Sequence, residues 1–95
     1  MFIVSLTYVA PLDEVDAAIP AHVAFLEKHY ATGTFLASGA KVPRTGGIIL
    51  ANASSEEALR EILSADPFHQ KKLAYYDVQE FVPSRTQAGL EGLLG

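Results

Sequence analysis

The order in which strand-like and helix-like segments follow one another most constrains the fold of this chain. The segment from Phe2 to Val9 is rich in β-branched and aromatic residues on both of its faces, which predicts a central strand. A helix is predicted from about Pro20 to about Tyr30, because apolar residues recur there at helical spacing as one inward stripe: Ile19, Val23, Leu26 and Tyr30. Further strands are predicted over 34–38, 46–51 and 74–82, and further helical segments after residue 54 or 55 and over 66–72.

This order, β-α-β-β-α-β, predicts an α+β fold of the ferredoxin-like type. Such a fold has a four-stranded antiparallel sheet that carries both helices on one face. Both faces of the first and last strands hold apolar or aromatic residues, so the face without helices needs a cover. A second copy packed sheet against sheet would supply it. We therefore expect a homodimer, or a higher oligomer built from such dimers.

Residues at the starts of the predicted helices are typical of helix caps. Leu12 to Ala18 supports a helical turn, and Pro20 either kinks that helix or begins a new one. Ser54 or Ser55 caps the second helix with a glutamate in the first turn. Asp66 caps the short helical segment, whose first residue is a proline.

Length, charge and cysteine content exclude several classes of protein. With 95 residues, 49% of them hydrophobic and 19% charged, the chain suits one compact domain over residues 1–95. A net charge of -4 argues against a nucleic-acid binder, which needs a basic face. The absence of cysteine excludes disulfides, thiolate nucleophiles and cysteine-ligated metals.

The two ends of the chain carry signals of location and association. The apolar run at the start stops at Pro11 and has no basic flank or small-residue cleavage site, so we expect neither a signal peptide nor a membrane span. A cytoplasmic location is therefore expected. Residues 84–95 combine glycines with apolar leucines, which predicts a tail that is either flexible or docked on a partner.

Two short motifs carry the candidate chemistry. Pro20-Ala21-His22 opens the first helix and Asp66-Pro67-Phe68 follows the second, and the predicted topology brings His22 and Asp66 to one edge of the domain. An imidazole can act as general base or acid, and a carboxylate can orient it and raise its basicity. The alternatives are structural: His22 as a partly buried histidine bonded to a backbone carbonyl, and Asp66 as an ordinary N-cap. Asp66 could also do both, with one oxygen for each task.

Other polar residues add further candidates. Ser38 could donate a hydrogen bond to a substrate oxygen, although a serine before a glycine is more often a turn residue. Tyr75 and Tyr76 point to opposite faces of the last strand, so one belongs to the core and the other could face a dimer cleft. His69 could complete a metal site with the His–Asp pair, but no standard metal spacing occurs and we expect no metal.

Four short motifs together resemble the YciI-like family, also called YCII-related domains, over nearly the whole chain up to Pro83: Pro20-Ala21-His22, Ser38-Gly39, Gly46-Gly47 and Asp66-Pro67-Phe68. The resemblance implies a dimeric α/β barrel of ferredoxin-like subunits. It also implies that the cleft holds a His–Asp pair, here His22 and Asp66, beside the strand end at Ser38 and Gly39. Some relatives are described as dehydrochlorinases of chlorinated hydroxyquinols, and the same fold includes muconolactone isomerases and small monooxygenases.

Two positions depart from this pattern. Many members have an arginine where this chain has Ile19, and a proline where it has Ala40. The bidentate anion clamp of that arginine is therefore missing, and Lys41 or Arg44 of the predicted hairpin loop would have to replace it.

These observations favour a small cofactor-independent enzyme of lyase or isomerase type that acts on a small organic substrate. His22 would move a proton and Asp66 would hold the productive tautomer. The substrate-binding residues would be Ser38, Gly39, Lys41 and Arg44. We expect no cofactor. The alternatives are a non-catalytic dimer that binds a small molecule or serves as an accessory subunit, and a heme- or flavin-dependent oxidoreductase, since one fold hosts many functions.

Overall fold

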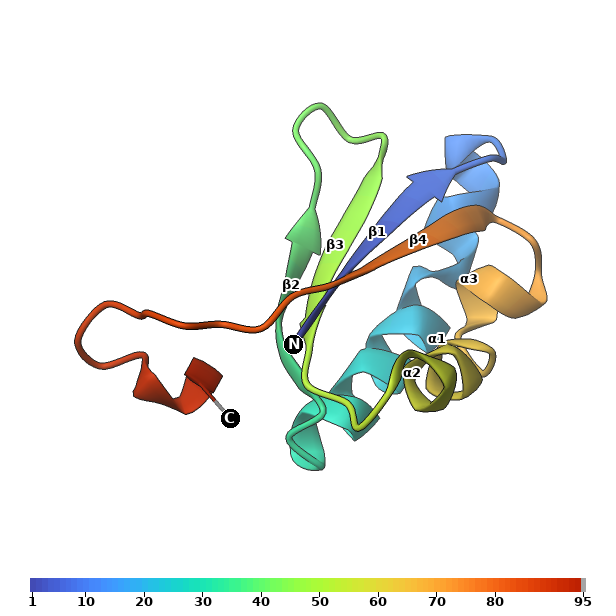
Figure 1. Cartoon of the computed structure of the whole chain (residues 1–95). Coiled ribbons are helices and arrows are strands. Elements are labelled where there is room, and N and C mark those ends of the chain that lie inside the picture. Colours follow the sequence, from blue (N-terminus) through green and yellow to red (C-terminus); the bar gives the residue numbers. More distant parts are fainter. Residues whose placement is uncertain (95) are drawn as a thin grey trace.

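The computed structural model describes residues 1–94 and confirms the predicted order of elements. The strands are β1 (Phe2–Tyr8), β2 (Phe35–Ala40), β3 (Gly46–Ala51) and β4 (Ala74–Glu80). The helices are α1 (Leu12–Ala31), α2 (Glu56–Leu63), α3 (Pro67–Gln70) and the short 3-10 helix η1 (Glu91–Leu94). The strands form one sheet in the order β2-β3-β1-β4, and every neighbouring pair is antiparallel. Helices α1, α2 and α3 lie on one side of this sheet (Figure 1), so the fold is ferredoxin-like α+β.

Strand β1 lies in the interior of the sheet, and its side chains point alternately to the two faces. Phe2, Val4 and Leu6 point toward the helices and are at most 2% exposed, whereas Ile3 points the other way and is 38% exposed. The backbone of β1 pairs with β3 on one side and with β4 on the other. The hydrophobic core therefore lies between the helices and one face of the sheet.

Helix α1 does not restart at Pro20, because residues 12–31 form a single helix that contains it. Proline has no N–H to donate to the carbonyl four residues earlier, and its ring is exposed. Gly33 follows the helix with a left-handed φ of 77°, and its N–H donates to the Tyr30 carbonyl at 3.0 Å. The chain can thus turn directly into β2.

The inward stripe predicted for α1 was wrong in part. Val23 and Tyr30 are 41% and 38% exposed. The side chains that face the sheet follow a neighbouring line at spacings of three and four, and all are buried or half-buried: Val15, Ala18, His22, Phe25 and His29. A search for large apolar residues missed this line because alanine is small and histidine is polar. His22 therefore lies on the face of α1 that packs against the sheet.

The shorter helices are capped as predicted. The Ser55 hydroxyl accepts from the Ala58 N–H at 3.1 Å, which selects Ser55 over Ser54 as the cap of α2. Asp66 caps α3, with a proline at the first helical position. Helix α3 ends before the predicted Lys72, which has a left-handed φ of 56°.

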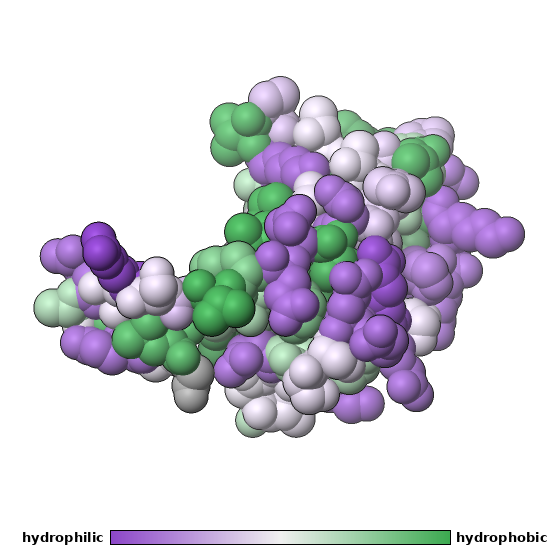
Figure 2. Space-filling view, viewed as in Figure 1, coloured by the Kyte–Doolittle hydropathy of each residue, from purple (hydrophilic) through white to green (hydrophobic). Residues whose placement is uncertain are grey.

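The second face of the sheet carries no helix within residues 1–94 and exposes apolar side chains. Ile3 and Ile48 are each 38% exposed there, and Tyr75 is 64% exposed. After β4 the chain leaves the sheet as a tail that ends in η1 (red in Figure 1). Figure 2 shows a hollow between this tail and the body of the domain, with apolar side chains gathered around it. The last residue of the predicted tail, Gly95, lies outside the described residues.

Among the helices described, none has both the length and the apolar character needed to cross a membrane.

Candidate active site

His22 lies on the inward line of α1 and is held in place by an aromatic contact and a hydrogen bond. Its ring stacks face to face on Phe68, with 3.9 Å between the ring centroids and 3° between the planes. Its Nδ1 lies 2.8 Å from Oδ1 of Asp66, and only 13% of the side chain is exposed. The imidazole is thus fixed by α1 on one side and by α3 on the other.

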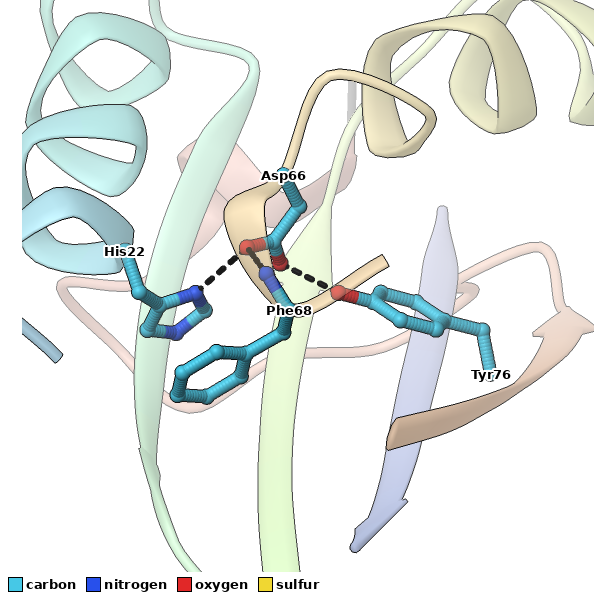
Figure 3. A network of polar contacts seen from close by, with 4 residues as sticks. All are labelled: His22, Asp66, Phe68 and Tyr76. Atoms are coloured by element: carbon cyan, nitrogen blue, oxygen red, sulfur yellow. Dashed lines mark hydrogen bonds and ion pairs between the residues drawn. The ribbon is translucent and has the colours of Figure 1, made fainter. Parts of the chain in front are cut away.

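Asp66 is fully buried and receives three hydrogen bonds (Figure 3). Its Oδ1 accepts from His22 Nδ1 and, at 3.0 Å, from the backbone N–H of Phe68. Its Oδ2 accepts from the hydroxyl of Tyr76. A buried carboxylate is stabilised by such a complete set of donors. Asp66 therefore caps α3 and orients the imidazole at once, and it uses the same oxygen for both tasks, not one for each as expected.

Tyr76 is the member of this cluster that sequence reasoning did not assign to the site. It projects from β4 into the core and is 8% exposed, whereas its neighbour Tyr75 is exposed on the other face. Burial, and then the hydrogen bond to Asp66, raise the pKa of Tyr76, so its hydroxyl keeps its proton and donates. Strand alternation could place one tyrosine inward, but the sequence held no signal for its partner.

A pocket of about 220 Å³ opens beside His22, between α1 and the β2–β3 hairpin. Its wall is mainly apolar and includes Leu6 of β1 and Ile49 of β3. His22, Ser38 and Arg44 contribute polar groups. Mainly apolar walls with a few polar groups are typical of sites that bind small molecules.

The hydrogen bond to Asp66 decides which nitrogen of the neutral imidazole can accept a proton. A carboxylate accepts, so Nδ1 of His22 carries a hydrogen, and in the neutral ring the lone pair is on Nε2. Nε2 lies on the opposite side of the ring from Asp66 (Figure 3). Within residues 1–94 no hydrogen bond occupies that nitrogen. A carboxylate in this position can hold an imidazole in the tautomer that leaves Nε2 free.

The predicted substrate-binding residues lie in different places. Ser38 and Gly39 line the pocket, and the Ser38 hydroxyl is 2.5 Å from the hydroxyl of Tyr30. Lys41 does not line it, and its Nζ is 3.4 Å from Oγ1 of Thr7. The structure therefore brings Ser38 and Gly39 to the His–Asp pair and leaves Lys41 apart.

Arg44 supplies the cation at the pocket rim. Its guanidinium donates a hydrogen bond from Nη2 to Oδ1 of Asp16 in α1, at 2.5 Å. It also lies 5.8 Å from the centroid of the Tyr8 ring. The hydrogen bond to Asp16 raises the pKa of Arg44. Ile19, at the family's arginine position, lines the pocket with an apolar side chain. The cation beside this pocket thus comes from the hairpin loop and not from α1.

The other histidines do not join this cluster. His29 packs edge-on against Phe25 at 4.9 Å between centroids, and burial, then the charge of Lys28, lower the pKa of His29. His69 lies with its ring edge-on to Tyr76 at 5.7 Å. In the described part of the chain, no three histidine or carboxylate side chains are grouped so that they could hold a metal.

Comparison with known proteins supports the fold. One solved structure with a similar fold is that of the 5-chloro-2-hydroxyhydroquinone dehydrochlorinase of Burkholderia phenoliruptrix in complex with 2,5-dihydroxybenzoquinone. It superposes with a TM-score of 0.71 and 20% sequence identity, over 85% of this chain and 93% of that one. A search of curated protein sequences found no significant match. The family model of the YCII-related domain matches residues 1–82. The chain therefore belongs to the YCII-related domain family.

Proposed function

We propose that this protein is a small cytoplasmic enzyme of lyase or isomerase type that works without a cofactor. The observation that carries the proposal is the buried His22–Asp66 pair beside a small, mainly apolar pocket. A volume of about 220 Å³ suits one substituted ring, since a cavity of about 150 Å³ already admits benzene. Residues 1–95 act as one domain of the family, with residues 84–95 as its tail.

In the proposed reaction His22 moves a proton on the substrate. Nε2 accepts a proton from a substrate carbon or hydroxyl, and the buried charge of Asp66 stabilises the imidazolium that forms. In an isomerase the same proton returns to another atom. In a lyase the electron pair of the broken C–H bond forms a double bond. The leaving group then departs with the electron pair of the bond that joined it to the neighbouring carbon.

Substrate binding is assigned to the polar groups around the pocket. Ser38 donates a hydrogen bond to a substrate oxygen, and Gly39 leaves room beside it. Arg44 attracts a negative group at the rim, while Asp16 holds it in place when the pocket is free. The dehydrochlorinase with a similar fold, described above in complex with a dihydroxybenzoquinone, supports a small oxygenated ring as the first substrate to test.

The decisive experiment compares histidine variants for turnover. The wild type is assayed with 5-chloro-2-hydroxyhydroquinone for chloride release, and with small unsaturated lactones for isomerisation. His22→Gln is expected to lower kcat by about 10²- to 10⁴-fold, the usual contribution of a general base. His29→Gln, a change on the same helix outside the pocket, is the matched control and should keep kcat.

Two outcomes would go against this function. Equal turnover by His22→Gln and the wild type would remove His22 from the reaction. Saturable binding of 2,5-dihydroxybenzoquinone with no turnover of any substrate tested would favour the alternative, a binding or accessory module.

We also propose that two copies associate through the open face of the sheet. The face places Ile3 and Ile48 on its central strands, half-exposed, with Tyr75 on the neighbouring strand. Exposed apolar area of this kind favours burial against a like surface. Light scattering at micromolar concentration should give twice the mass of one chain. Ile3→Glu should give a monomer, and Val42→Glu, on the exposed hairpin loop, should stay dimeric; a monomeric wild type would contradict the assembly.

A further inference from the structure

The hydroxyl of Tyr76 donates a hydrogen bond to Oδ2 of Asp66. The imidazole and the α3 backbone both bind the other oxygen, Oδ1. We propose that Tyr76 is a positioning residue for the pair. Its hydrogen bond holds part of the carboxylate charge away from His22, so that the ring keeps a free lone pair on Nε2. The inference concerns the site of the proposed function and rests on it for its catalytic meaning.

The fold gives Tyr76 this role by placing it on the far side of a carboxylate that water does not reach. Asp66 is 0% exposed, so its charge is balanced only by the groups that surround it. Figure 3 shows His22 and Tyr76 approaching that carboxylate from opposite sides. Tyr76 is opposite Leu6 in the register between β4 and β1, so the sheet itself sets the position of its hydroxyl.

The direction of the effect follows from how donors share a buried charge. The hydroxyl stays protonated because burial raises the pKa of Tyr76, and toward an ionised carboxylate, which can only accept, it donates. Hydrogen bonds to an ionised carboxylate are strong and withdraw charge from it. Without this donor, Asp66 would present more charge to the imidazole and would favour its doubly protonated form. A doubly protonated ring has no lone pair and cannot accept a proton from a substrate.

Other titratable or charged groups surround the pair without bonding to it. They come from each neighbouring element: Tyr8 of β1, His29 of α1, Arg44 of the β2–β3 loop and His69 of α3. In residues 1–94 no hydrogen bond joins any of them to His22 or Asp66. The Tyr76 hydroxyl is therefore the group whose removal acts most directly on the pair.

The test follows the protonation of His22 and needs no substrate. Protein labelled with ¹⁵N-histidine is titrated by NMR as the wild type, Tyr76→Phe and Tyr75→Phe. The second variant is the matched control, because it removes the same hydroxyl from the adjacent residue on the exposed face. In Tyr76→Phe the His22 ring should take up its second proton at higher pH, and the Nδ1 proton resonance should move downfield. Tyr75→Phe should titrate as the wild type; equal titration of all three proteins would overturn the role of Tyr76.

A second measurement keeps the phenol in place, in case Tyr76→Phe does not fold. 3-Fluorotyrosine placed at position 76 by genetic code expansion has a more acidic hydroxyl and is a stronger donor. The His22 ring should then take up its second proton at lower pH than in the wild type, opposite in sign to the phenylalanine variant. No shift, or a shift to higher pH, would overturn the inference. A shift in either variant together with full turnover by His22→Gln would instead contradict only the proposed function.

Discussion

Replacing Asp66 by alanine, serine and asparagine should separate its two structural tasks. Alanine removes the N-cap of α3, which costs about 1 kcal/mol, and leaves two donors without an acceptor, the Tyr76 hydroxyl and His22 Nδ1, at about 1–3 kcal/mol each. His22 is partly exposed and can turn to water, so we use the lower end for it. The sum is about 4 kcal/mol, a large part of the roughly 5–14 kcal/mol expected for a domain of this size.

The other two variants keep defined parts of this network. Serine can still cap α3 but cannot reach His22 or Tyr76, so Asp66→Ser should cost about 3 kcal/mol. Asparagine has nearly the shape of aspartate. Its oxygen can accept from Phe68 and from the imidazole. Its amide can donate to the oxygen of the Tyr76 hydroxyl, but the proton of that hydroxyl then has no acceptor, so Asp66→Asn should cost about 2 kcal/mol. The expected order of destabilisation is asparagine, serine, alanine.

Urea denaturation at neutral pH measures these differences, and thermal denaturation checks them. In a domain of this size 1 kcal/mol corresponds to about 4–8 °C in Tm, so Asp66→Ala should melt roughly 15–30 °C below the wild type. A serine variant as stable as the wild type would show that the contacts to His22 and Tyr76 add no stability. An asparagine variant as unstable as alanine would show that the charge, and not the hydrogen-bond geometry, holds this part of the fold.

Three further predictions concern the fold and its pH dependence. A Cβ at Gly46 would lie 1.7 Å from the Leu6 carbonyl oxygen, so Gly46→Ala should unfold the protein or shift the β1–β3 pairing, whereas Gly39→Ala meets nothing within 4 Å and should keep its circular dichroism spectrum. Because burial raises the pKa of Tyr76, the unfolded chain loses this proton first as the pH rises, and stability should fall above about pH 10 by about 1.4 kcal/mol per pH unit. Urea titrations should show a shallower alkaline loss in Tyr76→Phe; an equal slope would contradict the assignment. Ser55→Ala should lower the free energy of unfolding by about 1 kcal/mol through loss of the α2 cap, and no change in the urea midpoint would contradict it.

The sequence by itself determined the fold, because the signals that define it are local. The β-branched and aromatic residues of β1 and the capping residues Ser55 and Asp66 each act within a few positions along the chain. The order of these elements then leaves few topologies, and the predicted ferredoxin-like fold is observed, with the sheet order β2-β3-β1-β4. The inward line of α1 was missed because three of its five members are alanine or histidine, whose burial depends on what they pack against.

The sequence placed His22 and Asp66 at one edge of the domain, but only the tertiary structure decided which atoms meet there and what else joins them. The hydrogen bond between His22 and Asp66 joins positions 44 residues apart, and Tyr76 adds a third element to it. Which strand residue meets that carboxylate depends on sheet register and helix packing, which no local pattern encodes. The same reason separates Arg44, placed at the pocket by its bond to Asp16, from Lys41, which the structure places beside Thr7 instead. Local periodicity specifies elements, whereas a site depends on contacts between elements that meet only once the chain has folded.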